Sequence, residues 1–355
     1  MLIIPSGRPA RLARTREDAV VIDRYAWTSE VEQVAPGVHR IPLPLPNDGL
    51  RAVNVYAIQG TDGTGLIDGG WFIPEAFDTL RNSLAEIGVG IGDITTVLAT
   101  HFHRDHYTMA IELRRLTGCA VALGAPERAN VDAVMAGERA LDRLLALMCR
   151  AGAPEMLTSL PVRHSDSSKE YEHPTSLLAD GDRPVAGGRP LEALSTPGHT
   201  TGHFCFADDP SRLLFAGDHV LPHITPSIGF ETVPGHLPLA SYLRSLLRVR
   251  QRADAMLLPA HGPVTPSVHA RVDELLAHHD TRLRLCGDAV AAGARTAYQV
   301  AERVPWTRHQ RRLGELAPFD QLMAVAETFA HLEVLCLQAR LTVSERDSVD
   351  EFDVA

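Results

Sequence analysis

The chain has 355 residues, which is long for a single core and favours one large catalytic domain with a smaller appendage. Its content of 45% hydrophobic and 22% charged residues excludes a long disordered or low-complexity protein. The 34 basic and 44 acidic residues give a net charge of -10, which opposes a polyanionic partner and argues against nucleic acid as a ligand. The five cysteines include no CxxC pair, so neither a disulfide framework nor a zinc ribbon is expected.

The N-terminal residues 1–30 are expected to form a mixed, partly charged leader. They lack the sustained apolar stretch of a signal peptide, and no run in the chain approaches the length of a membrane span. We therefore expect a cytoplasmic protein that has no membrane partner.

Strand and helix patterns alternate from residue 31 to residue 125, which predicts a layered α/β architecture. Turn residues at 47–49 separate the first two strands, and Gly88 and Gly118 end the two helices. The expected elements are strands over 37–46, 51–60 and 64–68, a helix over 73–89, a strand over 94–100, a helix over 108–118 and a strand over 119–125.

The segment 126–160 has a different character, because it is rich in Ala, Leu and Arg with apolar residues at helical spacing. We interpret it as a helical insertion within a domain over 31–265. A polar stretch at 163–176 is expected to be a loop. Short strand patterns then resume, over 190–199, 203–209, 212–218 and 255–262.

Strand patterns fade after Pro266, and we place a domain boundary near residue 265. The segment 266–355 is predicted to be a mainly helical C-terminal domain, whose clearest helices cover 297–304 and 319–338.

The strongest functional signal is the sequence His101-Phe102-His103-Arg104-Asp105-His106, which directly follows an apolar strand. Imidazole and carboxylate together suit zinc, iron or manganese, and a strand end is a rigid place to mount such ligands. His101 and His103 are two residues apart and would leave the same face of an extended chain, whereas Asp105 and His106 would point elsewhere as a helix begins. This arrangement can serve two metal ions with separate pairs of ligands.

Three further elements place one acidic or histidine residue each at the end of an apolar strand. These residues are His199 in TPGHT, Asp218 in FAGDH and His261 in LPAHGP. A single histidine at a strand end is more often structural than a ligand. The ordered series of HxHxDH, His, Asp and His is much more specific than any of its parts.

This series resembles the metallo-β-lactamase superfamily over roughly residues 31–265. The resemblance implies a four-layer αββα sandwich with two divalent metal ions at one edge of its sheets, most simply Zn²⁺, although iron and manganese fit the same ligand types. It implies that His101, His103 and His199 bind one ion, that Asp105, His106 and His261 bind the other, and that Asp218 bridges them. Asp68 in LIDGG matches an acidic residue that supports the metal loop without binding metal.

The resemblance also implies a hydrolase. Two such metals can hold a bridging water and lower its pKa toward neutrality, so we expect the resulting hydroxide to attack a carbonyl or phosphoryl centre. Asp105 would orient this nucleophile, and His223 is our candidate for a further residue that lines the site. Tyr107 and His219 are weaker candidates, and His203 is expected to orient a ligand by hydrogen bonding.

The bridging aspartate argues against antibiotic hydrolysis, because true β-lactamases of this superfamily generally lack it. We expect hydrolysis of a thioester or small acyl ester, such as an acyl-CoA or glutathione thioester, because a thiolate leaving group needs little protonation. The open alternatives are a lactonase and a phosphodiesterase or ribonuclease on the same site, a mononuclear iron dioxygenase, and a binding protein that retains the metals.

The two helical segments leave several roles open. The insertion 126–160 can form one wall of a pocket for a small acyl substrate, or it can simply pack on the sandwich. The C-terminal helices can add a second wall or form the interface of a homodimer. This tail is similar to the winged-helix tail of a mitochondrial endoribonuclease of the superfamily, but it is not strongly basic.

Overall fold

The computed structural model describes residues 30–46, 49–158 and 168–355. Residues 1–29 of the expected leader, part of the first turn, the last two residues of the expected insertion and part of the 163–176 loop therefore lie outside the described residues. Two sheets hold most of the strands. The larger sheet contains β1 (Glu32–Ala35), β2 (Val38–Pro44), β3 (Ala52–Gly60), β4 (Gly63–Ile67), β5 (Ile94–Leu98), β6 (Ala120–Gly124) and β7 (Ser176–Leu178). The smaller sheet contains β10 (Glu192–Ser195), β11 (Phe204–Asp208), β12 (Leu213–Gly217) and β13 (Met256–Pro259).

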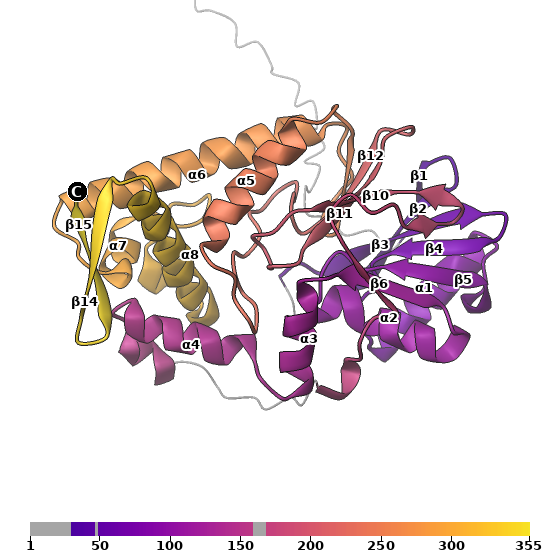
Figure 1. Cartoon of the computed structure of the whole chain (residues 1–355), viewed down its shortest axis with the longest axis horizontal. Coiled ribbons are helices and arrows are strands. Elements are labelled where there is room, and N and C mark those ends of the chain that lie inside the picture. Colours follow the sequence, from indigo (N-terminus) through magenta and orange to yellow (C-terminus); the bar gives the residue numbers. More distant parts are fainter. Residues whose placement is uncertain (1–29, 47–48, 159–167) are drawn as a thin grey trace, which may run out of the picture.

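Helices cover the outer faces of both sheets and build a further layer beside them (Figure 1). These helices are α1 (Pro74–Glu86), α2 (Arg104–Thr117), α3 (Glu127–Met135), α4 (Ala140–Arg150), α5 (Pro238–Arg250), α6 (Val268–Ala291), α7 (Ala297–Arg303) and α8 (Pro318–Leu337). Short 3₁₀ turns cover Ile91–Asp93, Pro154–Thr158, Ser168–Glu170 and Leu313–Glu315, and two short hairpins pair β8 (Val185–Ala186) with β9 (Arg189–Pro190) and β14 (Leu341–Arg346) with β15 (Val349–Val354).

The larger sheet changes from antiparallel to parallel pairing along its strand order. The strands from β1 to β4 pair antiparallel in sequence order, whereas β4 to β7 pair parallel. Parallel neighbours need a crossover, and α1 and α2 supply the first two. The left-handed Gly118 (φ 76°) ends α2 where the sequence predicts it. In the smaller sheet the same change occurs once, between β12 and β13, with α5 as the crossover.

Three hydrophobic clusters define the layers. One contains residues of the larger sheet with α1 and α2, a second fills the space between the two sheets, and a third joins the smaller sheet to α4, α5 and the C-terminal helices. Helix, sheet, sheet and helix therefore follow one another, and the predicted αββα sandwich is confirmed. The C-terminal residues share the third cluster with β10 to β12, so they complete the core of the sandwich.

The C-terminal segment ends in the hairpin of β14 and β15, which the sequence analysis did not predict. In β14 every residue after Leu341 is exposed. The strand therefore lacks the alternation of buried and exposed side chains from which strands are recognised. The hairpin contacts α4, α6 and α8.

Gly198 tests whether close contact with α5 fixes the segment that follows β10. It has a φ of 139°, and a Cβ built there would lie 2.4 Å from the Cα of Tyr242 on α5. We predict that Gly198→Ala lowers the free energy of unfolding by at least about 2 kcal/mol, from backbone strain and overpacking together. Thermal and urea denaturation measure this loss.

The matched control is Gly137→Ala, because Gly137 also has a positive φ (87°) but has nothing within 4 Å of the added Cβ. This variant is expected to lose only about 1 kcal/mol, which is the backbone cost alone. Equal losses in the two variants would show that contact with α5 does not constrain the segment before His199.

Candidate metal centre

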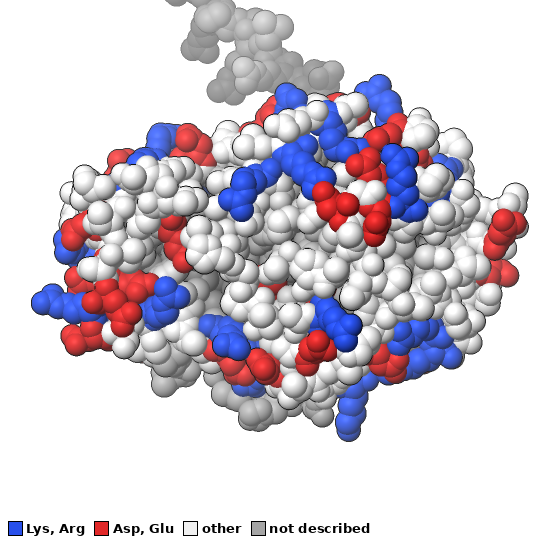
Figure 2. Space-filling model, in the orientation of Figure 1, with Lys and Arg blue, Asp and Glu red and all other residues white. Residues whose placement is uncertain are grey.

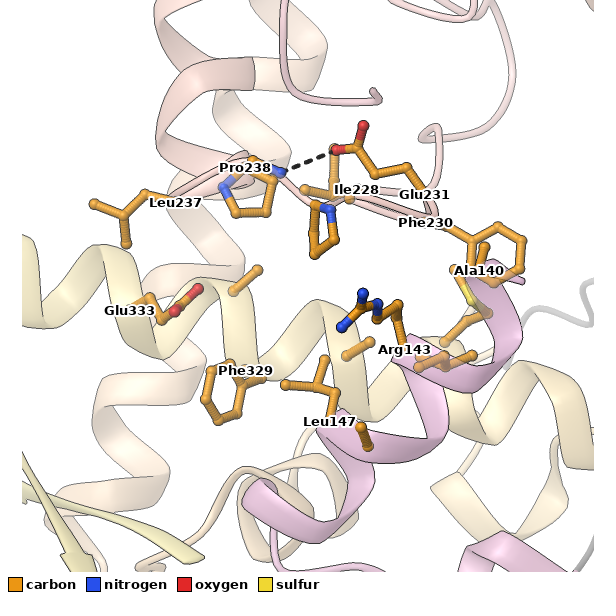
Figure 3. Close-up of a pocket in the computed structure, with 18 of the residues that line it drawn as sticks. Ala140, Arg143, Leu147, Ile228, Phe230, Glu231, Leu237, Pro238, Phe329 and Glu333 are labelled. Atoms are coloured by element: carbon orange, nitrogen blue, oxygen red, sulfur yellow. Dashed lines mark hydrogen bonds between the residues drawn. The ribbon is translucent and has the colours of Figure 1, made fainter. Parts of the chain in front are cut away.

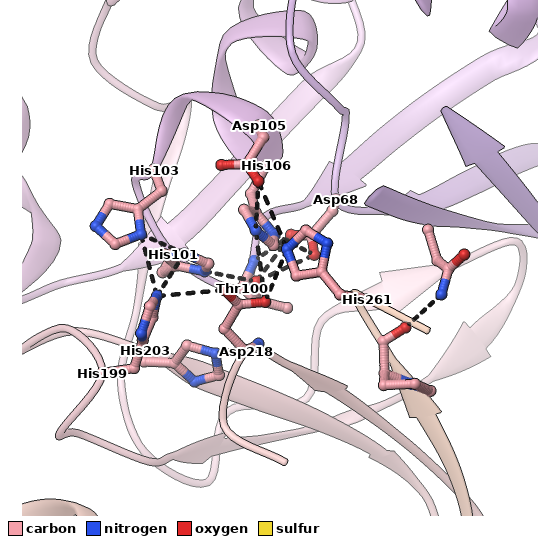
Figure 4. A network of polar contacts seen from close by, with 12 residues as sticks. Asp68, Thr100, His101, His103, Asp105, His106, His199, His203, Asp218 and His261 are labelled. Atoms are coloured by element: carbon pink, nitrogen blue, oxygen red, sulfur yellow. Dashed lines mark hydrogen bonds and ion pairs between the residues drawn. The ribbon is translucent and has the colours of Figure 1, made fainter. Parts of the chain in front are cut away.

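Strand ends from both sheets meet at one edge of the sandwich and bring the seven predicted ligands together (Figure 4). His101 and His103 lie between β5 and α2, and Asp105 and His106 lie in the first turn of α2. The other three residues follow β10, β12 and β13, and they are His199, Asp218 and His261.

The first group of ligands consists of His101, His103 and His199. The Nε2 of His101 lies 3.0 Å from the Nδ1 of His103, and the Nε2 of His199 lies 3.2 Å and 3.0 Å from these two atoms. A tetrahedral zinc site with Zn–N bonds of about 2.0–2.1 Å separates its ligand atoms by roughly 3.3 Å. Three imidazole nitrogens at this spacing fit one face of such a site.

The second group consists of Asp105, His106 and His261. The Oδ2 of Asp105 lies 3.6 Å from the Nε2 of His106 and 3.6 Å from the Nε2 of His261. At these distances the three atoms can bind one ion. The side chain of Asp105 is also the more exposed of the two carboxylates among the seven ligands, at 21% against 10% for Asp218.

Asp218 lies between the two groups and presents one oxygen to each. Its Oδ1 lies 3.7 Å from the Nε2 of His106 and 3.3 Å from that of His261. Its Oδ2 lies 3.4 Å from the Nε2 of His199. This is the geometry that a bridging carboxylate requires.

Three of the five histidines hold the ring nitrogen that faces away from the site against a backbone carbonyl. Because a carbonyl can only accept, that nitrogen must carry the proton and the other keeps its lone pair for a metal. The pairs are His103 Nε2 with Phe230 O at 2.9 Å, His199 Nδ1 with Ser227 O at 2.7 Å, and His261 Nδ1 with Ala52 O at 2.8 Å.

The other two histidines are oriented by Asp68, whose side chain is buried. The Nδ1 of His106 donates to Asp68 Oδ2 at 2.9 Å. The backbone N–H of Thr100 donates to Asp68 Oδ1 at 2.7 Å, and the Thr100 hydroxyl donates to the same carboxylate. This hydroxyl therefore accepts from His101 Nδ1 at 3.0 Å. The supporting role that the resemblance implies for Asp68 matches these contacts.

Three buried atoms that face the centre have no hydrogen-bond partner among the described residues, namely His106 Nε2, His261 Nε2 and Asp218 Oδ1. Buried polar atoms are nearly always satisfied, so three together indicate an absent partner. Lone pairs of imidazole and carboxylate are the donors that zinc, iron and manganese accept. The residues therefore fit two divalent metal ions.

Burial governs the electrostatics of the site. Burial lowers the pKa of His103 to about 3 and also holds the pKa values of His101 and His199 below the usual value, so these imidazoles are neutral at neutral pH. Burial alone would raise the pKa of Asp218, but the neighbouring His261 and His106 outweigh it and hold that pKa below its ordinary range. The first group thus offers neutral ligands and the bridge offers a negative charge, as metal binding requires.

His203 supports Asp218 from behind. Its Nε2 accepts the backbone N–H of Asp218 at 3.1 Å, and its Nδ1 contacts the hydroxyl of Thr196 at 2.8 Å. This contact orients the bridging carboxylate through the backbone, which is the kind of role that the sequence analysis expects for His203.

The candidate lining residues lie in different surroundings. His223 is half-buried in the loop after Asp218, beside Gly262, which follows the ligand His261. His219 is fully buried against Tyr242, which donates to its backbone carbonyl, and Tyr107 donates to the carbonyl of Glu172. The structure therefore keeps His223 near the ligand loops and places His219 and Tyr107 in the interior.

Sequence reasoning missed a buried network next to the first ligand group. The amide of Asn130 on α3 donates to Glu127 at 3.0 Å and to Glu231 at 2.9 Å, and the hydroxyl of Thr200 also donates to Glu127. Thr201 donates to Glu231 through both its backbone and its hydroxyl. Both threonines directly follow His199, but nothing in their local sequence indicates such partners.

Asp68 provides a test of the support for the ligands. We predict that Asp68→Ala weakens the binding of the second metal ion by about 10- to 100-fold, because His106 loses the acceptor that fixes its ring. Competition with a chromophoric chelator measures the affinity. Asp62→Ala, on the exposed turn before β4, is the control and should leave the affinity unchanged. Wild-type affinity in Asp68→Ala would contradict this role.

Glu127 provides a test that depends on pH. Burial raises its pKa from 4.5 to about 8, so the folded protein binds a proton that the unfolded chain releases above pH 4.5. The stability of the fold should therefore fall as the pH rises from about 4.5 to about 8. We predict that Glu127→Gln makes the melting temperature less dependent on pH across this window, whereas the exposed Glu86→Gln does not. Parallel pH profiles for both variants would argue against this titration.

Comparison with known proteins gives the same fold and family. Residues 48–261 match the metallo-beta-lactamase superfamily. A lactamase-like protein of Pestalotiopsis fici is 26% identical over 264 residues, which cover 72% of this chain and 65% of that protein. An enzyme of Aspergillus chevalieri named atrochrysone carboxyl ACP thioesterase is 25% identical over 257 residues, which cover 72% of this chain and 65% of that enzyme. The chain thus spans slightly less than two thirds of these relatives.

A solved structure resembles almost the whole chain. The crystal structure of a metallo-beta-lactamase family protein from Thermus thermophilus superposes with a TM-score of 0.75 at 27% identity, and it covers 91% of this chain and 100% of that protein. Its coverage extends beyond the sandwich into the C-terminal helices. With the αββα layers, the converging ligands and the match over more than half of its length, the chain belongs to the metallo-β-lactamase superfamily.

Proposed function

We propose that this protein is a metal-dependent hydrolase that cleaves thioesters of small acyl groups at a dinuclear centre. The observation that carries the proposal is Asp218, with one oxygen toward each group of ligands. His101, His103 and His199 would hold one ion, and Asp105, His106 and His261 the other. Bound here, two divalent metals supply Lewis acidity and lower the pKa of water toward neutrality.

The protein's own residues would control orientation and access. Asp105 is the more exposed of the two site carboxylates and can accept a hydrogen bond from the attacking water, which fixes the direction of attack. His203 keeps Asp218 in place through its backbone N–H. His223 is proposed to contact the substrate from the loop that follows Asp218. A thiolate leaves without a strong general acid, so this set of residues suffices for a thioester.

Zinc is proposed as the metal, because five imidazoles and two carboxylates match its ligand preferences. Iron and manganese accept the same donors. The thioesterase name of the A. chevalieri relative supports the thioester over other acyl esters. A lactone would present the same carbonyl chemistry to the same residues and is the second candidate.

The surface argues against a nucleic acid substrate. Figure 2 shows the Lys and Arg side chains of this face interspersed with Asp and Glu, without a continuous basic field. The net charge of -10 has the same implication for a phosphodiester polyanion.

Among the described residues, no helix combines the length and apolarity needed to cross a bilayer.

The proposal predicts release of free thiol from acyl thioesters by the zinc-loaded protein. Asp218→Ala should reduce kcat/KM by more than about 100-fold, because Asp218 would bind both ions, whereas Asp68 would only support a ligand. Asp209→Ala, an exposed aspartate in the turn between β11 and β12, is the matched control and should retain activity. A chromogenic thiol reagent follows the reaction.

Metal removal gives the complementary result. Dialysis against a chelator should abolish thiol release, and added Zn²⁺ should restore it. If the protein binds two metals per chain but cleaves no thioester in a panel of acyl-CoA and acyl-glutathione substrates, the thioesterase proposal fails. Hydrolysis of lactones by the same preparation would then favour the second candidate.

A further inference from the structure

A cavity of about 470 Å³ lies between α4, the loop 228–238 and α8 (Figure 3). Its volume falls within the range of pockets that enclose small ligands. The three walls come from the insertion, from the segment after Asp218 and from the C-terminal helix α8, which are distant in the sequence. No residue of the metal centre lines the cavity.

The walls of the cavity are largely apolar. Leu144 and Leu147 face it from α4, and Phe329 and Ala330 face it from α8. Arg143 and Arg150 also line it, but their side chains are more than half exposed and are paired with carboxylates, Glu138 at 3.2 Å and Asp350 at 2.7 Å. Each cation is thus compensated by a carboxylate, and the Arg150 guanidinium also lies 4.9 Å from the ring centroid of Phe329. The remaining aliphatic and aromatic walls suit an apolar occupant.

Glu333 is the acidic group on the α8 side of the cavity. Burial raises its pKa to about 7, so a large fraction of this carboxyl is neutral at neutral pH. A neutral carboxyl tolerates an apolar neighbour far better than a buried carboxylate does. Glu333 therefore does not exclude a hydrocarbon chain.

The loop 228–238 joins the cavity to the metal centre. The carbonyl of Phe230 accepts the Nε2 proton of His103 at 2.9 Å, and the carbonyl of Ser227 accepts the Nδ1 proton of His199 at 2.7 Å. Phe230 itself lines the cavity, and its ring centroid lies 6.5 Å from that of His103. The cavity is therefore one side chain away from the first group of ligands.

Hydrogen bonds to α3 and to the segment after His199 fix the loop, which is one wall of the cavity. Glu231 accepts the backbone N–H of Thr201 at 2.8 Å and that of Gly235 at 3.3 Å. The backbone of Val233 donates to Asn130 on α3 at 2.8 Å. A wall that is held by several partly buried hydrogen bonds has a defined position, which is what selection by chain length needs.

We propose that this cavity receives the acyl chain of the thioester substrate and thereby sets the preferred chain length. This inference rests on the proposed function, because the thioester carbonyl would have to lie at the metal centre on the other side of Phe230. The pantetheine side of the substrate is the poorer occupant, because its amides would find few hydrogen-bond partners in walls that are mainly aliphatic and aromatic.

The first experiment measures kcat/KM for acetyl, butyryl, hexanoyl and octanoyl thioesters of N-acetylcysteamine with the zinc-loaded protein. In the wild type, kcat/KM should rise by roughly threefold to fourfold for each methylene until the cavity is full. Ala330→Trp, which fills the cavity from α8, should flatten this series and lower the octanoyl-to-acetyl ratio at least about tenfold. Ala85→Trp, on the exposed face of α1, is the matched control and should keep the wild-type ratio.

A second variant keeps the proposal testable if Ala330→Trp does not fold. Leu147→Ala enlarges the cavity from α4 and should move the optimum to a longer chain. Circular dichroism and thermal denaturation of each variant establish that the fold is intact. An unchanged chain-length series in both folded variants would overturn the proposal.

A binding measurement separates this inference from the proposed function. Calorimetry with octanoate and the chelator-treated, metal-free protein reports on the cavity without catalysis. Binding by the wild type that weakens at least tenfold in Ala330→Trp would support the cavity as an acyl site even if no thioester is cleaved. If the protein cleaves thioesters but does not bind octanoate, and if its kcat/KM does not depend on chain length, the proposed function stands and the inference about the cavity is wrong. If Ala330→Trp reduces the cleavage of acetyl-CoA and octanoyl-CoA equally, the cavity holds the carrier and the inference is wrong.

Discussion

The carboxylate of Asp68 holds together three chain segments on which the metal centre depends. It follows β4 in a left-handed conformation (φ 60°), accepts from Thr100 beyond β5, and accepts from His106 in the first turn of α2. Only 2% of Asp68 is exposed, and removing one partner of a buried charge costs about 3–5 kcal/mol. The strained backbone persists because these bonds over-determine it. The ligand pairs His101–His103 and Asp105–His106 therefore depend on Asp68, which is not itself one of the seven ligands.

Hydrogen bonds from distant segments complete the centre. The carbonyls that fix His103, His199 and His261 belong to the loop after Asp218 and to β3. The ligand geometry therefore forms only when both sheets and this loop are in place, which couples metal binding to folding. Burial keeps the first three imidazoles neutral, while His106 and His261 keep Asp218 ionised. The first three imidazoles and Asp218 are thus in the protonation states that metal binding requires.

The parts of this site that could be predicted from sequence are those in which metal-binding residues stand next to a recognisable strand or helix. The motif from His101 to His106 follows an apolar strand and begins a helix, so its place at a strand end can be predicted from sequence. The convergence of His199, Asp218 and His261 needed the family resemblance, because spacing alone does not bring separate strand ends together. The carbonyl acceptors and the network of Glu127 and Glu231 could not be predicted, since a backbone carbonyl has no sequence signature and these partners meet only in the folded chain.

The helical additions enclose a cavity beside the metal centre. Helices α4 and α8 share one hydrophobic cluster with β10 to β12, and with the loop 228–238 they enclose the cavity. Because carbonyls of residues 227 and 230 orient two ligands, a shift of this loop would move those ligands. Glu231 anchors the loop to Thr201 and to α3 through Asn130, independently of α4 and α8. The hydrogen bonds that hold the loop therefore come from α3 and from the segment after His199, whereas α4 and α8 supply the other walls of the cavity.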